Sequence, residues 1–555
     1  MTPDLLEKLA TLWPEITLIS GAVVCMLIGL SSSAAVRKQS ATVAGAALVL
    51  AGVITLAGAF STDVIPGSGS GAFTLDMAGY VKLAVCSVGL LLLLVAAAVP
   101  EGLRLTRESE AAGATSGGAF DPAHTIRGEF FAFFLFSLSG VMLTAGADDL
   151  AWLFLALELT SLPTYVMVAT SRDRVLAQEA GVKYFFLGAL AVAVFLYGFA
   201  LLYGATGATQ FGQMRAYVTA ELAAGHALSP LLIAGLVLSI VGIAFKIAAA
   251  PMHFYAADVY QGAATPVTAF LAFVPKTAGF VAIILLLGVI EPALRAESVG
   301  ISVGAEPVTW LLWVMAALTM TVGNVLALLQ TSVKRLLAYS SIAHSGYMLV
   351  ALVGERIAPG SGEAGALGNG AAAVLFYLVA YGVGNLGAFA VLALLEARGE
   401  EADSFDDIAG QSRRFPGLAL VMLVSVLSLV GLPPMVGFVG KLYLFGTAID
   451  NGFVGLVIIA VLNSAISAVY YLRIASACYF GSPTDVLQPV RAPARALGAG
   501  AAALATVVLG IAGGWLVDAA RQATGASAPS RPIQVQKPSH DADGSPVVSS
   551  ADHGR

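Results

Sequence analysis

The chain has 555 residues, of which 58% are hydrophobic and 11% are charged, and its formal net charge is −6. Soluble globular chains carry about 25% charged residues, so this composition excludes an ordinary water-soluble domain and predicts an integral membrane protein. The lipid bilayer is its expected surroundings, and no nucleic-acid partner is expected.

Apolar residues come in blocks that are long enough to cross a bilayer. About 20 residues at 1.5 Å rise per residue span a hydrocarbon core of ~30 Å. The blocks predict an all-α polytopic membrane protein with about fourteen transmembrane helices. The predicted spans lie near 15–30, 41–60, 76–98, 130–146, 149–170, 180–203, 231–260, 266–290, 308–329, 335–353, 370–396, 416–447, 452–480 and 494–517.

Four segments outside these spans have features of their own. The N-terminal residues 1–15 lack the basic region and cleavage site of a secretory signal, so we expect them to be retained. Residues 101–128 are a polar loop, and 209–228 is long enough for a short surface helix. Residues 522–555 are rich in Ser, Pro, Asp and His without periodicity, which predicts a disordered tail.

The sequence predicts no cofactor or metal ion in this chain. Cys25, Cys86 and Cys478 are scattered through apolar blocks without paired spacing, so we interpret them as small core residues. The chain also contains no Gly-rich phosphate loop and no flavin or dinucleotide fingerprint.

Basic residues alternate strongly between the loops. If the N-terminus faces outside, the positive-inside rule is obeyed, because the predicted outer loops between helices hold only Arg215, Arg295 and Arg356. Both termini are therefore predicted on the periplasmic side of a bacterial plasma membrane. The predicted cytoplasmic loops hold Arg37, Lys38, Arg104, Arg107, Arg127, Arg172, Arg174, Lys334, Arg335, Arg398, Arg413, Arg414, Arg491 and Arg495.

Two predicted spans are interrupted by proline. The segments 248–255 and 429–438 place Pro251, Pro433 and Pro434 within apolar sequence. Proline removes a helix hydrogen bond, and a broken helix is tolerated in a membrane only where protein or water satisfies the freed backbone groups. Two such breaks in corresponding halves predict an inverted-repeat transporter, although many membrane helices carry proline for packing alone.

Four ionisable residues in the predicted spans are the strongest functional candidates. An ionisable group inside the bilayer costs roughly 2.5–3.5 kcal/mol on insertion scales, so Glu158, Lys246, Lys276 and Lys441 are functional candidates. The alternative for Glu158 is an acid near a helix end in contact with water. The alternative for each lysine is snorkelling to a surface, which is difficult for Lys246 and Lys276 because long apolar runs flank them.

Other ionisable residues are weaker candidates. Lys183 lies four residues after Glu179, so an ordinary i,i+4 ion pair competes with a functional role. Lys82 lies near the start of its span and is predicted to snorkel. His253 and His344 are able to relay protons near neutral pH, and each is equally consistent with a packing role.

Burial explains how such lysines could move protons. Removal from water disfavours a charged lysine, whereas a neighbouring carboxylate stabilises the charge. A lysine with a movable acidic partner is therefore a proton switch, and a row of them predicts a path across the membrane.

The chain resembles the antiporter-like membrane subunits of respiratory complex I over roughly residues 10–518. The resemblance lies in Glu158-Leu-Thr-Ser-Leu-Pro163, in FKIAAAPMHFYAADVYQGAATPV at 245–267, in VPK at 274–276 and in GLPPMVGFVGK at 431–441. The sequence around Glu158 and the lysine at position 441 are similar to N-type rather than L-type or M-type subunits. The extended loop at 101–128 and the tail after 522 depart from the family pattern without touching a motif.

The resemblance implies two inverted five-helix repeats. These would occupy 129–290 (helices 4–8) and 308–480 (helices 9–13), preceded by helices 1–3 and the polar loop in 1–128 and followed by a last helix at 494–517. It also implies roles for individual side chains: Glu158 pairs with Lys246, Lys276 is the central relay, Lys441 is the relay toward the exit and Lys183 participates.

Three functions are consistent with these features. The first is a proton-translocating membrane-arm subunit of an NADH–quinone oxidoreductase, a translocase subunit without a redox centre of its own. Its partners would be the other membrane subunits (A, H, J, K, L and M types), and FMN, iron–sulfur clusters and quinone would belong to partner subunits. The second is an Mrp-type cation/proton antiporter subunit. The third, a structural scaffold, is disfavoured by the cost of the buried charges.

Overall fold

The computed structural model describes residues 11–31, 33–60, 75–96, 128–171, 175–298, 303–353, 369–397, 400–482 and 487–525. The predicted polar loop at 101–128, apart from Gly128, and the predicted tail from 526 onward lie outside the described residues.

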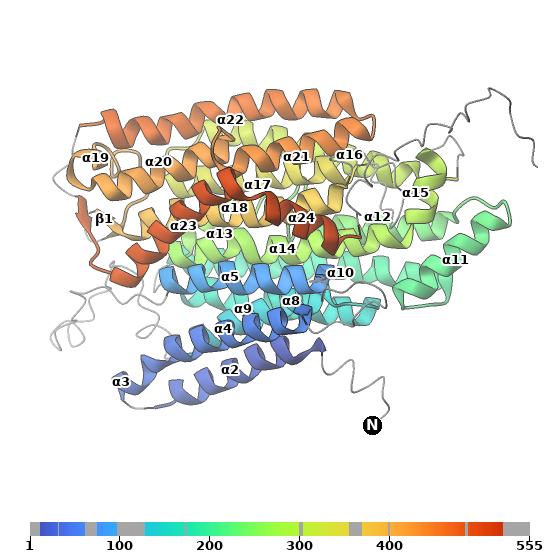
Figure 1. The fold of residues 1–555 in the computed structure, drawn as a ribbon, viewed down its shortest axis with the longest axis horizontal. Helices are drawn as coiled ribbons and strands as arrows, with labels where there is room; N and C mark the ends of the chain where they lie inside the picture. Colours follow the sequence, from blue (N-terminus) through green and yellow to red (C-terminus); the bar gives the residue numbers. More distant parts are fainter. Residues whose placement is uncertain are drawn as a thin grey trace, which may run out of the picture.

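Nearly all described elements are helices, and they form one elongated bundle in which the long helices run along the same axis (Figure 1). The predicted helices 1–3 correspond to α2 (Trp13–Gly29), α4 (Gln39–Phe60) and α5 (Met77–Ala96), with the short α3 (Ala34–Arg37) between the first two.

The predicted helices 4–8 are also present, and the seventh is broken. Their elements are α8 (Glu129–Ala145), α9 (Leu150–Thr170), α10 (Val175–Thr206), α12 (Pro230–Ala244) with α13 (Ala256–Gly262), and α14 (Thr265–Val289). The predicted surface helix is α11 (Phe211–Ala223), and α15 (Glu291–Ser298) follows α14.

The second half repeats this order of long helices, with a break in the fourth. Its elements are α16 (Glu306–Leu328), α17 (Val333–Leu352), α18 (Gly370–Ala393), α20 (Pro416–Val430) with α21 (Val436–Asp450), and α22 (Val454–Phe480). The short α19 (Gln411–Arg414) precedes α20.

The last predicted span differs from the expectation in its end. It is divided at Gly513 into α23 (Pro493–Ala512) and α24 (Gly514–Ala523), so the helix continues past residue 517 and past the predicted start of the tail at 522. The mixed composition of α24 hid this continuation, because its apolar residues occupy one side of a short helix and do not form a continuous apolar run.

A three-stranded sheet lies at one end of the bundle and was not predicted. Strand β1 (Leu395–Ala397) is central, between β2 (Glu400–Glu401) and β3 (Leu487–Pro489), and both pairings are antiparallel. In the register Glu396 is opposite Glu401 and Leu395 is opposite Pro489. Strands this short carry no clear alternation, so their pairing depends on the surrounding helices.

Local sequence explains where many helices begin. Proline in the first turn lacks an N–H that would have no helical partner there, and it stands in the first turn of α2, α12, α14, α16, α20 and α23. Asp149, Ser229, Ser332 and Asn369 cap α9, α12, α17 and α18 by accepting a backbone N–H with their side-chain oxygens.

Nine described helices are long and apolar enough to cross a membrane, and α2, α8, α12 and α20 are shorter apolar helices. Exposed Leu, Val, Ile and Phe side chains on α4, α10 and α22 form the outer surface, as expected of helices that face lipid. The centre of the bundle contains α18, in which every residue is buried, and α14, in which nearly every residue is buried. This core encloses the charged residues described below.

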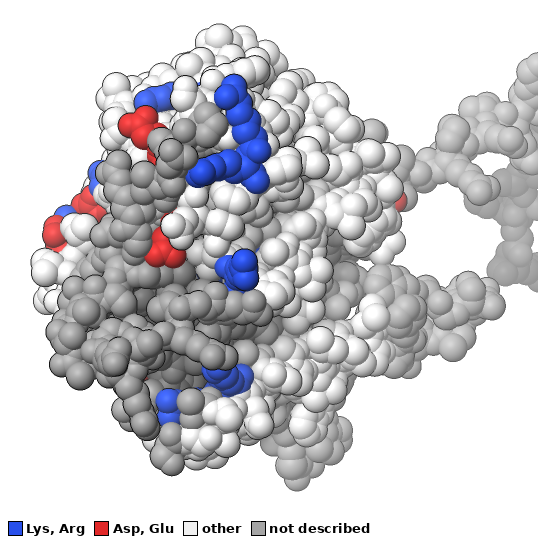
Figure 2. Space-filling model, turned by 90° about the vertical axis from the view of Figure 1, so that its left-hand side faces the viewer, with Lys and Arg blue, Asp and Glu red and all other residues white. Residues whose placement is uncertain are grey.

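Both described ends of the chain lie at the same end of the bundle (Figure 1). Thr11 accepts a hydrogen bond from Lys82 near the start of α5, and Thr524 accepts one from Asn369 at the start of α18. The opposite end, viewed in Figure 2, carries both basic and acidic side chains. The short helices α3 and α19 at this end contribute arginines.

The snorkelling prediction for Lys82 is wrong. Lys82 is buried and its Nζ lies 2.9 Å from a carboxylate oxygen of Glu15, which is also buried. The acid comes from α2 and the lysine from α5, so only the packing of these helices brings them together. A short interior ion pair removes the need for Lys82 to reach a surface.

Candidate proton-transfer site

The break between α12 and α13 is held open by side chains from other helices. Residues 245–255 form turns, and Ala248 has φ of +53°, a conformation that residues with a Cβ adopt rarely. The N–H of Ala250 donates to Thr319 Oγ1 at 2.9 Å, and the Ser345 hydroxyl donates to the carbonyl of Ile247 at 2.6 Å. Backbone groups freed by the break are therefore satisfied within the protein, as burial in a bilayer requires.

Lys246 lies at the start of this break and faces Glu158. Its Nζ is 3.3 Å from Glu158 Oε1 and donates to the Ser161 hydroxyl at 2.6 Å and to the Leu157 carbonyl at 3.3 Å. Lys246 is 4% exposed, whereas the side chain of Glu158 is 17% exposed. The ammonium therefore donates only to protein acceptors, and the carboxylate is the more exposed member of the pair.

Lys276 lies next along the path, on the central helix α14. Its Nζ donates to the Ile247 carbonyl at 3.3 Å, to the Ser341 carbonyl at 2.5 Å and to the Ser345 hydroxyl at 2.6 Å. Ile247 follows Lys246 in the chain, so Lys276 hydrogen-bonds to the backbone of the residue next to Lys246. Pro275 beside Lys276 lies inside α14 without ending it.

Helices α17, α18 and α22 supply the polar groups beyond Lys276. The His344 ring nitrogens lie 2.7 Å from the Tyr377 hydroxyl and 2.9 Å from the Tyr471 hydroxyl. Tyr471 also contacts the Ser340 hydroxyl. Because imidazole and hydroxyl groups both donate and accept hydrogen bonds, this cluster is able to pass a proton in either direction.

Lys441 lies after the break between α20 and α21. Its Nζ donates to the Val430 carbonyl at 2.7 Å and to the Ser464 hydroxyl at 2.9 Å, and it lies 4.9 Å from the centre of the Tyr347 ring. Val430 is the last residue of α20, so the lysine satisfies a carbonyl at the break that Gly431 (φ +88°) and Pro433–Pro434 create. Tyr347 is on α17, three residues after His344.

The structure thus arranges four of the predicted residues in order through the buried interior. Glu158 and Lys246 are in contact, Lys276 contacts the backbone beside Lys246, and α17 connects Lys276 with the neighbourhood of Lys441. His344 lies within this connection, surrounded by aromatic rings.

Lys183 and His253 are placed differently. Lys183 forms ion pairs with Glu179 at 2.7 Å and with Asp258 at 2.8 Å, and its side chain is 40% exposed. The i,i+4 pair that competed with a functional role is therefore present, although Asp258 joins it. His253 lies within the first break and is partly buried, and in the described part of the chain its Nδ1 has no hydrogen-bond partner.

Sequence reasoning missed the serines and tyrosines of the path. Ser161, Ser341, Ser345, Tyr377 and Tyr471 contact the lysines or the histidine. Ser161 was detectable because it stands three residues after Glu158, about one helical turn away. Tyr377 and Tyr471 carried no signal, because tyrosines in apolar helices are common and their partner His344 lies more than a hundred residues from Tyr471.

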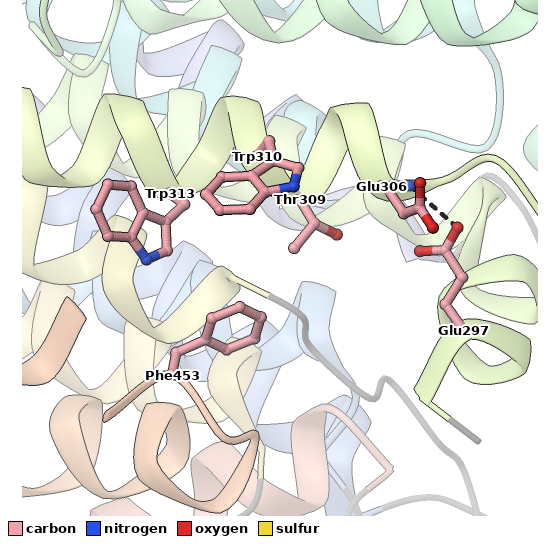
Figure 3. Close-up of a pocket in the computed structure, with 6 residues that line it drawn as sticks. All are labelled: Glu297, Glu306, Thr309, Trp310, Trp313 and Phe453. Atoms are coloured by element: carbon pink, nitrogen blue, oxygen red, sulfur yellow. Dashed lines mark hydrogen bonds between the residues drawn. The ribbon is translucent and has the colours of Figure 1, made fainter. Parts of the chain in front are cut away.

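A pocket of about 220 Å³ lies away from the lysine row, between the ends of α15, α16 and α22 (Figure 3). Trp310, Trp313 and Phe453 give it an apolar wall, and Glu297 accepts the backbone N–H of Glu306 at its rim. Burial raises the pKa of the Glu297 carboxyl, while the N–H groups of Ala305 and Glu306 oppose this shift. Tryptophans at a helix end are typical of the membrane interface. In the residues that the structure describes, no group of three His, Cys, Asp or Glu side chains is placed to hold a metal ion.

The broken spans and the interior row of lysines define a polytopic membrane protein of the transporter class. The chain belongs to the family described as NADH:quinone oxidoreductase/Mrp antiporter, TM, whose profile matches residues 147–467. This segment contains every candidate from Glu158 to Lys441.

Bacterial relatives of this chain are named NADH-quinone oxidoreductase subunit N. The one from Trichlorobacter lovleyi is 45% identical over 355 residues, which cover 64% of this chain and 68% of that protein. The one from Herminiimonas arsenicoxydans is 41% identical over 360 residues, which cover 64% and 69%.

Solved structures support the fold. A chain of respiratory complex I from Thermus thermophilus, solved with bound aureothin, is 32% identical with a TM-score of 0.68, covering 91% of this chain and 98% of that one. A chain of the Mrp complex from Dietzia sp. DQ12-45-1b has a TM-score of 0.71 at 21% identity, covering 94% and 97%, so it supports the fold alone.

Proposed function

We propose that this chain translocates protons as the N-type membrane subunit of a bacterial NADH–quinone oxidoreductase. The observation that supports this function best is the ordered series of Glu158, Lys246, Lys276, His344 and Lys441 inside an apolar bundle of this family. Relatives at 37–45% identity carry the subunit N name, which favours this function over the Mrp-type antiporter.

Proton movement would begin at the separable pair. While Glu158 is close, it stabilises the ammonium form of Lys246, and when the two separate, the buried ammonium loses its only carboxylate partner within the described residues. Lys246 then releases its proton toward Lys276. A permanent tight pair would hold Lys246 protonated, so separation of the pair is required for transport.

Transfer through the second half would use groups on α17. Lys276 and Lys441 contact carbonyl and hydroxyl oxygens, which accept hydrogen bonds from an ammonium and do not fix its charge as a carboxylate does. Ser345, His344 and the tyrosines lie between them. Water molecules or side-chain rotation would complete the transfers, because neighbouring groups on α17 face different partners.

The redox reaction would take place in other subunits. FMN, the iron–sulfur clusters and the quinone site are assigned to partner chains, and the neighbouring partners would be membrane subunits of the A, H, J, K, L and M types. The roles proposed for Lys183 as a participant and for His253 as an accessory proton acceptor rest on their positions beside the first break.

The chain would span the bacterial inner membrane with both termini on the periplasmic side. The shared position of both described ends and the excess of basic residues in the opposite loops support this orientation.

Composition of the native complex tests this function directly. An affinity tag on the C-terminal tail should recover flavin and iron–sulfur subunits with NADH oxidation in mild detergent. The isolated chain should retain neither NADH oxidation nor a visible-absorbing group. Recovery of this chain with antiporter subunits and without flavin would overturn the proposal in favour of the Mrp-type function.

A further inference from the structure

Asp258 is shared by two cations from different halves of the bundle. Its Oδ2 accepts a hydrogen bond from Lys183 Nζ at 2.8 Å, and its Oδ1 accepts one from an Arg335 guanidinium nitrogen at 2.7 Å. Lys183 belongs to α10, Asp258 to the short helix α13 after the first break, and Arg335 to α17 in the second half. One carboxylate therefore joins three elements across the two halves.

The two cations depend on Asp258 unequally. Lys183 has a second carboxylate, Glu179, at 2.7 Å. Arg335 otherwise donates to the side-chain amide oxygens of Gln261 and Gln330, each at 3.2 Å, and its only ion pair in the described chain is with Asp258. Loss of the Asp258 charge would leave Lys183 neutralised and Arg335 unbalanced, so the effect would fall on α17.

The same short helix also contacts the acceptors of Lys276. Tyr260, two residues after Asp258 on α13, lies with its hydroxyl 3.3 Å from the Ser341 hydroxyl of α17. The carbonyl of Ser341 accepts the 2.5 Å hydrogen bond from Lys276. Helix α13 continues from the break that contains Lys246, so it connects the first lysine to the surroundings of the second.

The exposure of the Asp258 cluster suits a contact that opens and closes. The side chains of Lys183, Asp258 and Arg335 are 40%, 35% and 27% exposed, and ion pairs with such access to solvent contribute only about 0–1 kcal/mol. A nearby buried pair, Lys334 with Glu401, has 2% exposure on both sides and also engages Thr265. That pair joins α17 to β2, and through Glu401 to the start of α14, so the position of α17 against α14 does not depend on Asp258.

We infer that Asp258 is a positioning residue that couples the Glu158–Lys246 pair to the acceptors of Lys276 through α13 and α17. The inference rests on the proposed proton-translocating function. While Asp258 holds Arg335, α17 stays against α13 and presents Ser341 and Ser345 to Lys276. When that contact opens, only uncharged hydrogen bonds through Gln261 and Tyr260 still join α13 to α17, and the hold on the Lys276 acceptors is weaker.

The test is Asp258→Asn in the intact complex, with NADH-driven proton uptake into sealed inverted vesicles measured at equal complex content. We expect uptake to fall about fivefold, the lower end of typical coupling between sites. Asp258→Glu, which restores the charge, should recover most of it. Glu179→Gln is the matched comparison, because it removes the other carboxylate of Lys183 and leaves the link between α13 and α17, and its effect should stay below about twofold.

Arg335→Gln removes the same link and keeps Asp258 paired with Lys183, so it provides a second test if the Asp258 variant fails to assemble. Combined with Asp258→Asn, it should add little to the single loss, because the only ion pair lost by Arg335 is the one that Asp258→Asn already removes. Wild-type uptake in assembled Asp258→Asn or Arg335→Gln complexes, or additive losses, would overturn the inference. Lys276→Ala distinguishes failure of the proposed function from failure of the inference about Asp258. If Lys276→Ala and the Asp258 and Arg335 variants all pump normally, the proposed function is wrong. If Lys276→Ala is defective and the other variants pump normally, only the role of Asp258 is wrong.

Discussion

At the scale of single residues, the buried lysines differ in what stabilises their charge. Lys246 faces the carboxylate of Glu158, whereas Lys276 and Lys441 have carbonyl and hydroxyl acceptors and no ion pair among the described residues. An ammonium without a nearby carboxylate is more easily deprotonated when buried. Lys276 and Lys441 are therefore suited to bind and release protons during transfer. Lys246 is suited to keep its proton until Glu158 moves away.

Lys441 provides a prediction at this scale. Lys441→Ala should lower coupled proton uptake, because the relay group is lost. Lys441→Arg should lower it as much, because arginine keeps its proton at all accessible pH values. Uptake is measured in sealed vesicles at equal complex content. Full activity of the Arg variant would show that a fixed positive charge suffices at this position.

The sequence was informative about single residues where chemistry and hydropathy conflict. Glu158, Lys246, Lys276 and Lys441 stood out because charges in apolar runs are costly. Glu15 did not stand out, since it lies at the predicted start of the first span, and its pairing with Lys82 depends on helix packing across 67 residues of sequence. Asp258 lies within the segment 245–267 that carries the family resemblance, but its partners Lys183 and Arg335 come from helices distant in the sequence.

At the scale of elements, the approach of α14 to the first break depends on a glycine. A Cβ on Gly279 would lie 2.6 Å from the Ile247 side chain and 3.3 Å from Lys246 Cβ. Gly279 is three residues after Lys276, about one helical turn. The turn of α14 that carries Lys276 therefore also packs closely against the residues of the break. Proline signals predicted both breaks, but this close approach had no signal in the sequence, because glycine is abundant throughout the apolar blocks.

Gly279→Ala should therefore displace the break and lengthen the contact between Lys276 and the Ile247 carbonyl. We expect proton uptake to fall severalfold while the complex still assembles. Gly288→Ala on the same helix is the matched control, because a Cβ there meets nothing within 4 Å. Equal activity of the two variants would contradict a role for this approach.

Arg495 joins three helices at the end of the bundle with the sheet. It is 0% exposed and donates to the Val95 carbonyl of α5 at 2.9 Å and to the Ala393 carbonyl of α18 at 2.7 Å. These carbonyls lie at helix C-termini, where a cation is favoured. Arg495→Met should leave them unsatisfied and destabilise the protein by about 1–3 kcal/mol, measured as a lower unfolding temperature in detergent. An unchanged unfolding temperature would show that water or lipid replaces the guanidinium.

At the scale of the whole molecule, hydropathy predicted the helices well because a bilayer imposes both length and composition on each span. Every predicted span coincides with a helix or with a pair of half-helices. The small sheet and the extension of α24 were missed, because both lie where the chain leaves the apolar blocks and where contacts between distant segments decide the structure.

Orientation is the prediction that belongs to this scale. Both termini should face the periplasm, because the loops at the opposite end hold most of the basic residues. A single cysteine introduced near His540, in a variant without the native cysteines, should react with a membrane-impermeant reagent in intact spheroplasts. Reaction only in inverted vesicles would reverse the orientation and, with it, the direction assigned to the path.

The coupling of Glu158 to Lys246 is the central claim, because it places the switch at the start of the path. In sealed inverted vesicles, NADH-driven proton uptake is compared for Glu158→Gln, Lys246→Ala and the double variant, at equal content of assembled complex. We predict that each single variant loses most uptake and that the double variant is little worse than either, because the two residues act as one unit. Near-normal uptake in both single variants, or strictly additive losses in the double variant, would contradict the account.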